Sequence, residues 1–117
     1  MGKKNGYRFQ VIKVKRAQIR SDKKYLGAVN ITVKAQTPFS PNWSMVIGHK
    51  HGILSDEQYT QLYNEILDAA KDSDYRRLFE KAENNTLTLL CYCRDDWFCH
   101  THLLIKRLKE KFPDKII

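Results

Sequence analysis

The sequence predicts a single α/β domain in which helices pack on a small sheet. Two strand patterns near the amino terminus and a third, strongly apolar one at residues 86–93 alternate with segments of helical periodicity, an order typical of a layered α/β domain. The chain has 117 residues, of which 42% are hydrophobic and 29% charged, and this is enough apolar material for one core. We therefore interpret residues 1–117 as one domain and expect residues 1–6 to be flexible.

The two amino-terminal strands are expected to form an antiparallel β-hairpin. Residues 7–15 are rich in β-branched and aromatic side chains, and in residues 29–34 apolar and polar positions alternate as in a half-buried strand. Residues 20–24 between them have the composition of a turn. A hairpin is the simplest pairing that this order allows.

Three helices are expected in the middle of the chain. Ser40 followed by Pro41 is typical of a helix start, which predicts a short helix to about His49. Ser55 and Gln58 have the spacing of a capping box, and the apolar residues after them recur at helical intervals. Residues 74–82 predict a third, short helix.

The last two elements are a central strand and a terminal helix. Residues 86–93 are nearly continuously apolar and contain no Gly or Pro, which favours a strand in the middle of the sheet covered on both faces. A helix is expected to begin near Cys99 or His100 and to end at Pro113. Helices packed on a sheet with a central strand complete the predicted α/β architecture.

Positive charge is concentrated in the first half of the chain. The net charge is +8, and residues 1–50 account for +10 while residues 51–117 account for −2. A one-sided basic surface attracts phosphate groups of nucleotides or nucleic acids, although lysines on an edge strand also serve to keep that strand unpaired. Aromatic residues among these basic ones include Tyr25, which can stack on a base or belong to the core.

The sequence indicates a cytoplasmic protein with no membrane partner. No apolar run approaches the roughly 20 residues that span a bilayer, and Gly6 stands where a myristoylation signal needs Ser or Thr. The first six residues lack the apolar stretch typical of a signal peptide, and the three cysteines are an odd number without the spacing of a disulfide framework. A reducing compartment is therefore expected.

One segment has the composition of a functional site. Residues 91–102 contain three cysteines, two histidines, one arginine and two aspartates, and they fall at a predicted strand-to-helix turn. In α/β sheets, ligands bind beyond the carboxyl ends of the strands, where a helix amino terminus also attracts anions. We therefore expect a ligand pocket at this turn.

Three interpretations of the cysteines stay open. Cys91 and Cys93, two apart on a strand, would share a face and could bind zinc together with Cys99, His100 and His102, but the spacing is not a standard zinc pattern. We therefore predict no tightly held metal. Cys99 beside His100 at the helix start could instead be a nucleophile, and simple packing of buried thiols is the third interpretation.

The remaining candidates lie on either side of this segment. Asp96 could act as an acid or base, although aspartates before a helix also serve as caps. Arg94 and His102 are candidate ligand-binding residues within the turn. Trp43 and Lys50, on or beside the first predicted helix, are candidates for binding a phosphate-bearing ligand, and a solvated helix end explains them equally well.

These motifs resemble the YeaO-like domain-of-unknown-function family (DUF 488). The residues that carry the resemblance are Phe39-Ser-Pro-Asn-Trp, Lys50-His-Gly, and Leu89-Leu-Cys-Tyr-Cys followed by Cys99-His100 and a helix, so it covers roughly residues 27–110. It implies a Rossmann-like α/β domain with a pocket around these residues, and it implies no particular reaction. Thr101 stands where an Arg is usual in the family. The short length and the Cys-Tyr-Cys form are similar to small phage-encoded members.

Two hypotheses of function follow. The first is a domain that binds a phosphate-bearing ligand, a nucleotide or nucleic acid, in a pocket at the cysteine turn, with hydrolase or transferase chemistry as an open question. Cys99, His100 and Asp96 are its candidate catalytic residues, and no resident cofactor is expected. The alternative is a non-catalytic basic module that binds DNA, RNA or a host protein. The place where positive charge converges, a pocket or a flat lysine face, distinguishes the two.

Overall fold

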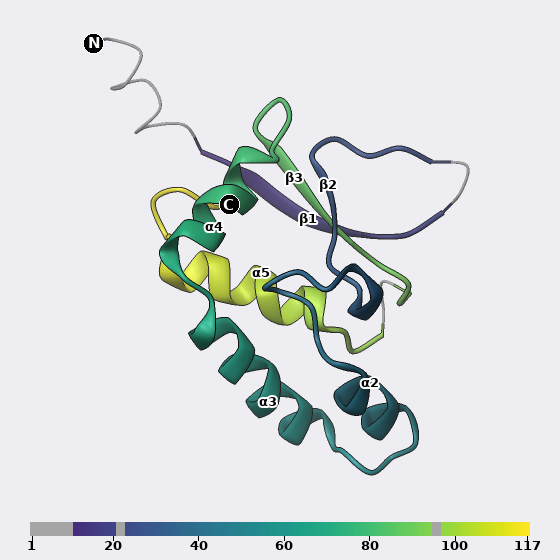
Figure 1. Cartoon of the computed structure of the whole chain (residues 1–117). Helices are drawn as coiled ribbons and strands as arrows, with labels where there is room; N and C mark the ends of the chain where they lie inside the picture. Colours follow the sequence, from purple (N-terminus) through teal and green to yellow (C-terminus); the bar gives the residue numbers. More distant parts are fainter. Residues whose placement is uncertain (1–10, 21–22, 95–96) are drawn as a thin grey trace, which may run out of the picture.

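The computed structural model describes residues 11–20, 23–94 and 97–117, and it has the predicted α/β class. Residues 1–6, expected to be flexible, lie outside the described ranges. The described residues form three strands and four α-helices, and Figure 1 shows how they are arranged. The elements in chain order are β1 (Lys13–Gln18), β2 (Ala28–Asn30), a 3₁₀ turn (Val33–Ala35), α2 (Trp43–Lys50), α3 (Asp56–Ala69), α4 (Asp72–Glu80), β3 (Thr86–Cys91) and α5 (His100–Lys111).

The sheet is parallel, and β3 is its central strand, as predicted. The strand order is β1-β3-β2, with Val14 opposite Leu87 and Val29 opposite Leu89. Successive residues of a strand point to opposite faces, and Leu87, Thr88 and Leu89 are all fully buried. The apolar run at residues 86–91 therefore serves a strand that is paired at both edges and buried on both faces.

The predicted amino-terminal hairpin is wrong. β1 and β2 are separated by β3 and are parallel, so the chain between them returns to the amino-terminal edge of the sheet (Figure 1). The composition of residues 20–24 was consistent with a hairpin, but β3 pairs with one strand along each of its two edges. Residues 21 and 22 of that turn lie outside the described ranges.

β2 is also shorter than the alternation of residues 29–34 predicts. The strand ends at Asn30, whose side-chain oxygen accepts hydrogen bonds from the backbone N and the hydroxyl of Thr32 (3.0 and 2.7 Å). Such a local bond competes with strand pairing and turns the chain. A 3₁₀ turn at Val33–Ala35 follows in place of further strand.

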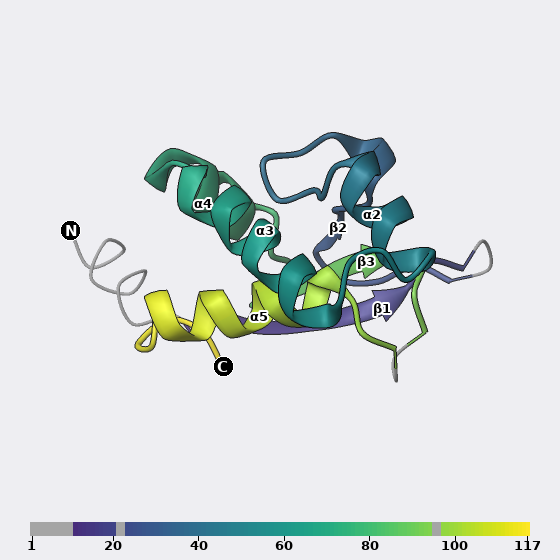
Figure 2. The same ribbon diagram turned by 90° about the horizontal axis from the view of Figure 1, so that it is seen from below.

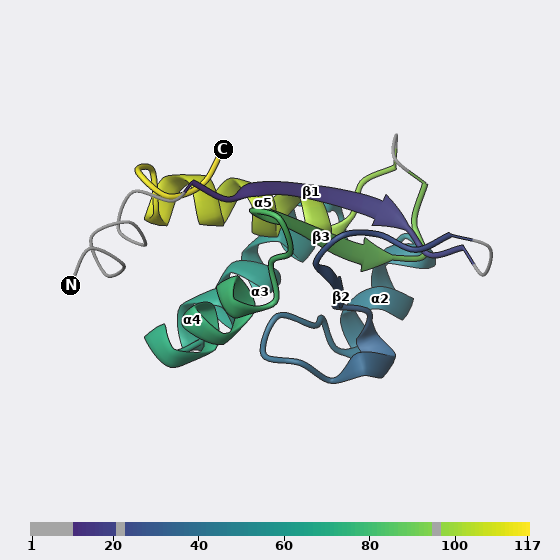
Figure 3. The same cartoon turned by 90° about the horizontal axis from the view of Figure 1, so that it is seen from above.

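Helices α3 and α5 lie on the same side of the sheet (Figures 2 and 3). Helix α5 contacts β1, β3 and α3, and its buried stripe includes Leu104 and Leu108. On β1, Val14 is buried whereas Lys13 and Lys15 are exposed, so alternate residues of this strand face the helices and solvent. None of the helices within the described residues is long and apolar enough to cross a membrane.

Side-chain capping sets the starts of α2 and α3. Ser55 accepts from the backbone N of Gln58, and the Gln58 side chain accepts from the backbone N of Ser55, which confirms the predicted capping box. The predicted start at Ser40 and Pro41 is wrong, because Asn42 caps α2 by accepting from the backbone N of Met45. Ser40 instead accepts a hydrogen bond from the backbone N of Thr37.

The β2 edge depends on one glycine. Gly27 has a φ of 57°, and a Cβ at this position would lie 2.1 Å from the carbonyl oxygen of Thr86. The backbone N of Thr88 donates to the Gly27 carbonyl at 2.9 Å, so this close approach joins the start of β2 to β3. Asn84 and Asn85, with φ values of 49° and 59°, form the turn before β3.

Candidate functional site

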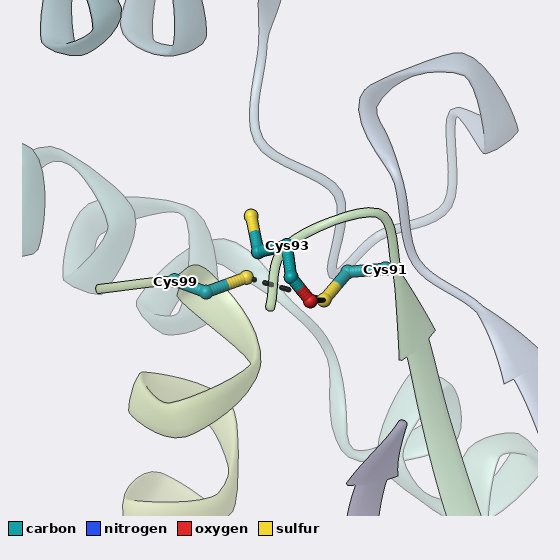
Figure 4. Close-up of side chains that lie close together, drawn as sticks. All are labelled: Cys91, Cys93 and Cys99. Atoms are coloured by element: carbon teal, nitrogen blue, oxygen red, sulfur yellow. Dashed lines mark hydrogen bonds between the residues drawn. The ribbon is translucent and has the colours of Figure 1, made fainter. Parts of the chain in front are cut away.

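The three cysteines form one cluster at the carboxyl end of the sheet. Cys91 is the last residue of β3, Cys93 lies in the following loop, and Cys99 is the N-cap of α5 (Figure 4). Their sulfur atoms all lie within 4.8 Å of one another, and the Sγ atoms of Cys91 and Cys99 are 3.4 Å apart. All three are free thiols, and together they could hold a metal ion.

The geometry differs from the expectation for this pair of cysteines in one respect. We predicted that Cys91 and Cys93 both lie on the strand, whereas β3 ends at Cys91 and the chain bends at once. The bend brings Cys93 back toward the start of α5, where Cys99 makes no capping hydrogen bond with its side chain. The Cys99 sulfur is therefore directed at the other two.

Arg16 holds the cluster together. Its Nε donates to the hydroxyl of Thr101 at 2.9 Å, and its Nη2 donates to the Sγ of Cys91 at 2.8 Å and to the carbonyl oxygen of Cys93 at 2.6 Å. One guanidinium from β1 thus joins the end of β3, the loop after it and the first turn of α5.

Hydrogen bonding within the cluster favours one anionic sulfur. The Cys91 and Cys93 thiols, and then Thr101, hydrogen-bond the Cys99 sulfur and hold its pKa well below the usual range, although burial opposes this. Hydrogen bonds with the side chains of Cys91 and Cys99 raise the pKa of Cys93. The cluster therefore stabilises a thiolate at Cys99, at the positive end of α5.

His100 is a buried, neutral imidazole. Its Nε2 lies 2.8 Å from the carbonyl oxygen of Ile31, and since a carbonyl only accepts, Nε2 carries the proton. Burial lowers the pKa of His100, and its Nδ1 lies 3.5 Å from the Sγ of Cys99. The catalytic role suggested for Cys99 and His100 stays a prediction, and Asp96 lies outside the described residues.

A basic cavity adjoins the cluster. It has a volume of about 530 Å³ and lies at the carboxyl end of β1. Arg16 belongs to both, because its side chain lines the cavity and contacts the cluster. The lining residues are Lys15, Arg16, Ala17, Gln18, Arg20, Lys23, Tyr25 and Arg94, so five of the eight are cationic.

Of the candidate ligand-binding residues, Arg94 lines this cavity, whereas Trp43, Lys50 and His102 do not. The Arg94 guanidinium carbon lies 5.5 Å from the centre of the Trp97 ring, which positions the side chain at the rim. Trp43 and Lys50 are exposed at opposite ends of α2, and His102 is exposed on the first turn of α5. The structure thus brings the three cysteines, His100 and Arg94 to one region and leaves Trp43 and Lys50 at the surface.

An aromatic contact explains how α2 reaches this region. The ring of His49 lies 5.0 Å from Phe98 and 5.2 Å from Tyr59, and Tyr59 lies 5.5 Å from Phe98. His49 also bonds the carboxylate of Asp56 through Nε2 at 2.6 Å. The end of α2 therefore packs beside the residue that precedes Cys99, through His49 and not through Lys50.

Sequence reasoning missed Arg16 and Thr101. Arg16 counted only as one of many basic residues, yet the alternation of its strand places it with Ile12 and Val14 on the apolar face. An arginine at an inward position was the signal that could have identified it. Thr101, noted only for replacing an Arg, is fully buried and accepts from the guanidinium that β1 supplies.

A parallel sheet with a cysteine cluster and a basic cavity at its carboxyl edge defines a small α/β domain with one candidate ligand site. The chain belongs to the DUF488 family, because the model of the active DUF488-N3 subclade, DUF488-N3a, matches residues 3–112. This confirms the family resemblance of the cysteine motifs and extends it over β1. No curated protein and no solved structure matches the chain.

Proposed function

We propose that this protein binds a phosphate-bearing ligand, a nucleotide or the end of a nucleic acid, in the basic cavity beside the cysteine cluster. The observation that carries the proposal is the convergence of Lys15, Arg16, Arg20, Lys23 and Arg94 on one cavity. Guanidinium and ammonium groups are the side chains that bind phosphate oxygens most strongly.

The position of the cavity supports the same function. It lies at the carboxyl end of β1, the edge at which ligands bind in parallel α/β sheets. Tyr25 is part of the lining, and its hydroxyl lies 3.4 Å from the carbonyl oxygen of Gln18, which ties its ring to the end of β1. An aromatic ring beside cationic groups suits a nucleotide, because a base can stack while its phosphates are neutralised.

The alternative, a flat basic module for DNA, RNA or a host protein, has less support. Lys13 and Lys15 are exposed side by side on one face of β1, but Lys15 also lines the cavity. The charge thus converges on a concave site. The matching subclade is described as active, a word that names no reaction, and hydrolase or transferase chemistry on the bound ligand stays an open question. Three free thiols support a cytoplasmic location.

A binding experiment with charge-matched variants tests the proposal. The full chain is titrated with a nucleoside triphosphate and with a fluorescent DNA duplex that does or does not carry a 5′-phosphate. We expect Lys15→Gln/Lys23→Gln to weaken the binding of either phosphate ligand by at least about tenfold, because each lost contact with a phosphate costs a charge-assisted hydrogen bond.

The control is Lys34→Gln/Lys106→Gln, which removes the same charge from exposed residues that do not line the cavity. Equal weakening by both variants would show that the ligand responds to overall charge, and the cavity would not be the site. Binding of the nucleoside triphosphate alone identifies a nucleotide ligand, and dependence on the 5′-phosphate identifies a nucleic-acid end.

A further inference from the structure

We propose that Cys91, Cys93 and Cys99 bind a zinc ion through their three sulfur atoms, with the fourth coordination position left to water or a bound ligand. The proposal concerns a different set of atoms from the phosphate cavity and does not depend on it. The sequence argued against a metal because the spacing is not a standard zinc pattern and because Cys91 and Cys93 were expected on one strand; the bend after Cys91 removes the second reason.

The spacing of the sulfur atoms suits a tetrahedral zinc ion. A Zn–S bond is about 2.3 Å long, so two sulfurs of a tetrahedral site lie about 3.8 Å apart. The three sulfurs of the cluster already lie within 4.8 Å of one another, and those of Cys91 and Cys99 are 3.4 Å apart. Small side-chain rotations therefore suffice, without a change in the backbone.

The backbone that carries these cysteines is fixed by the fold. Cys91 is the last residue of the central strand and is fixed by β1, since Gln18 lies opposite it and the backbone N of Ile19 donates to its carbonyl. Cys99 begins α5, and its carbonyl accepts from the backbone N of His102. The Cys93 carbonyl is held by Arg16. All three ligand positions are thus set before a metal binds.

The charge of the site selects zinc over a monovalent soft cation. Three thiolates and Zn²⁺ carry a net charge of −1, which the guanidinium of Arg16, 2.8 Å from the Cys91 sulfur, neutralises. The same thiolates with Cu⁺ would leave a charge of −1 after Arg16. A hydrogen bond from a charged group to a ligand atom is also the outer-shell contact typical of built metal sites.

Simple packing explains this cluster less well. A buried cysteine that serves only as a small hydrophobic residue is surrounded by apolar atoms. Here the Cys91 sulfur accepts from a cation, and the sulfurs of both Cys91 and Cys99 face other sulfurs. The candidate group contains three ligands among the described residues, which leave out Asp95 and Asp96. Three protein ligands and an open position are typical of catalytic zinc.

Metal analysis of the full chain is the first test. Protein expressed in zinc-supplemented medium and purified without a chelator is expected to contain one zinc per chain by mass spectrometry. Titration of the metal-free protein with Co²⁺ is expected to produce the intense sulfur-to-metal absorption band of thiolate ligands. A folded chain that holds neither zinc nor thiolate-bound cobalt would overturn the proposal.

Two variants locate the site. Cys93→Ser changes a half-buried loop residue and is expected to weaken zinc binding by at least about 100-fold, since even outer-shell changes reach that size. His102→Ala removes an exposed ligand-type side chain from the same segment and should retain the metal. Loss of zinc from the histidine variant with retention by the cysteine variant would place the site elsewhere and contradict us.

Alkylation of the unmodified chain gives a readout that needs no variant. Zinc is expected to protect the half-buried Cys93 from N-ethylmaleimide under native conditions, and a chelator is expected to remove this protection. Equal alkylation of Cys93 with and without zinc, in protein that contains the metal, would show that Cys93 is not a ligand and would refute the three-sulfur site.

Discussion

The Nη2 of Arg16 lies 2.8 Å from the Sγ of Cys91, so a charged side chain of the first strand meets the last residue of the third (Figure 4 shows the cysteine end of this contact). The two residues are 75 positions apart in the chain. Because the same guanidinium also bonds Thr101 and the Cys93 carbonyl, the site depends on β1 as much as on the cysteine segment itself.

Replacing Arg16 should destabilise the whole domain. Arg16→Lys keeps the charge but loses the planar fork that reaches three acceptors, and we expect the free energy of unfolding to fall by about 2–3 kcal/mol. Urea denaturation followed by circular dichroism measures this. The neighbouring, exposed Lys15→Gln should change it by less than about 0.5 kcal/mol. Similar losses for both variants would contradict the role of Arg16.

Gly27 and Gly52 both have positive φ angles, so the same substitution to alanine can be compared at the two positions. Gly27→Ala places a Cβ 2.1 Å from the Thr86 carbonyl oxygen, so the β2–β3 contact must open, and we expect a loss of at least about 3 kcal/mol. Gly52→Ala has no atom within 4 Å of its new Cβ and should cost only the backbone strain, about 1 kcal/mol. Thermal unfolding of both variants measures the difference, and equal shifts would argue against the close approach at Gly27.

Removal of one buried hydroxyl should make stability less sensitive to alkaline pH. Tyr63 is fully buried and donates to the Phe39 carbonyl at 2.7 Å, so Tyr63→Phe should cost about 1–3 kcal/mol at neutral pH. Tyr92→Phe, an exposed change of the same kind, should leave neutral-pH stability unaltered.

The sign of the pH effect follows from burial, which raises the pKa of Tyr63 well above 10.0 in the folded chain. Above pH 10 the unfolded chain loses this proton while the folded chain keeps it, so the natural protein loses stability as pH rises. The gap between natural protein and Tyr63→Phe should therefore shrink by up to about 1.4 kcal/mol per pH unit. Urea titrations between pH 8 and about 11 test this, and a constant gap would contradict it.

Backbone amides of β3 should exchange slowly with solvent. Thr88 donates to the Gly27 carbonyl and is fully buried, and Leu89 lies in the same doubly paired strand. We expect these two amides to exchange only on global unfolding, and that of exposed Lys24 to exchange many times faster. Hydrogen exchange followed by NMR measures these exchange rates. Comparable rates at Leu89 and Lys24 would mean that β3 is not central.

The salt dependence of the binding constant should distinguish contacts with phosphate from other modes of binding. If the basic cavity meets duplex DNA, log K is expected to fall with log salt by about 0.9 per phosphate contacted. Lys15→Gln/Lys23→Gln should make this slope shallower by up to about 1.8, while His102→Ala should leave it unchanged. Titration at several salt concentrations measures the slopes. An unchanged slope in the lysine variant would show that these lysines meet no phosphate.

The fold class, the central strand and the helix at Cys99 could be predicted, because each depends on local pattern. The apolar run at residues 86–91 and the Ser55 capping box are visible in a few neighbouring residues. The hairpin was wrong because strand pairing is decided by residues far apart, and the turn at residues 20–24 carries no information about β3. β2 ends at Asn30, whose side chain accepts a hydrogen bond from the backbone N of Thr32. The alternation of apolar and polar residues does not reveal such a bond.

The position of the cysteine cluster at a strand-to-helix turn could be predicted from the sequence, but its three-dimensional arrangement could not. The predicted strand-to-helix turn correctly joined Cys91, Cys99 and His100, whereas the path of the chain at Cys93 required the bend after β3. Arg16 was missed because its partners lie 75 or more positions away. Trp43 and Lys50 were included because they are close to a predicted helix, and the helix in fact faces the cluster with His49.

The parallel topology also determines the order in which this chain can assemble during synthesis. β3 is the pairing partner of both other described strands and is the last of the three to leave the ribosome. Until residue 86 emerges, β1 and β2 have no partner strand in the described sheet, and unpaired edges of this kind invite association with other chains. The charge of +10 on residues 1–50 makes two nascent copies repel each other during that interval.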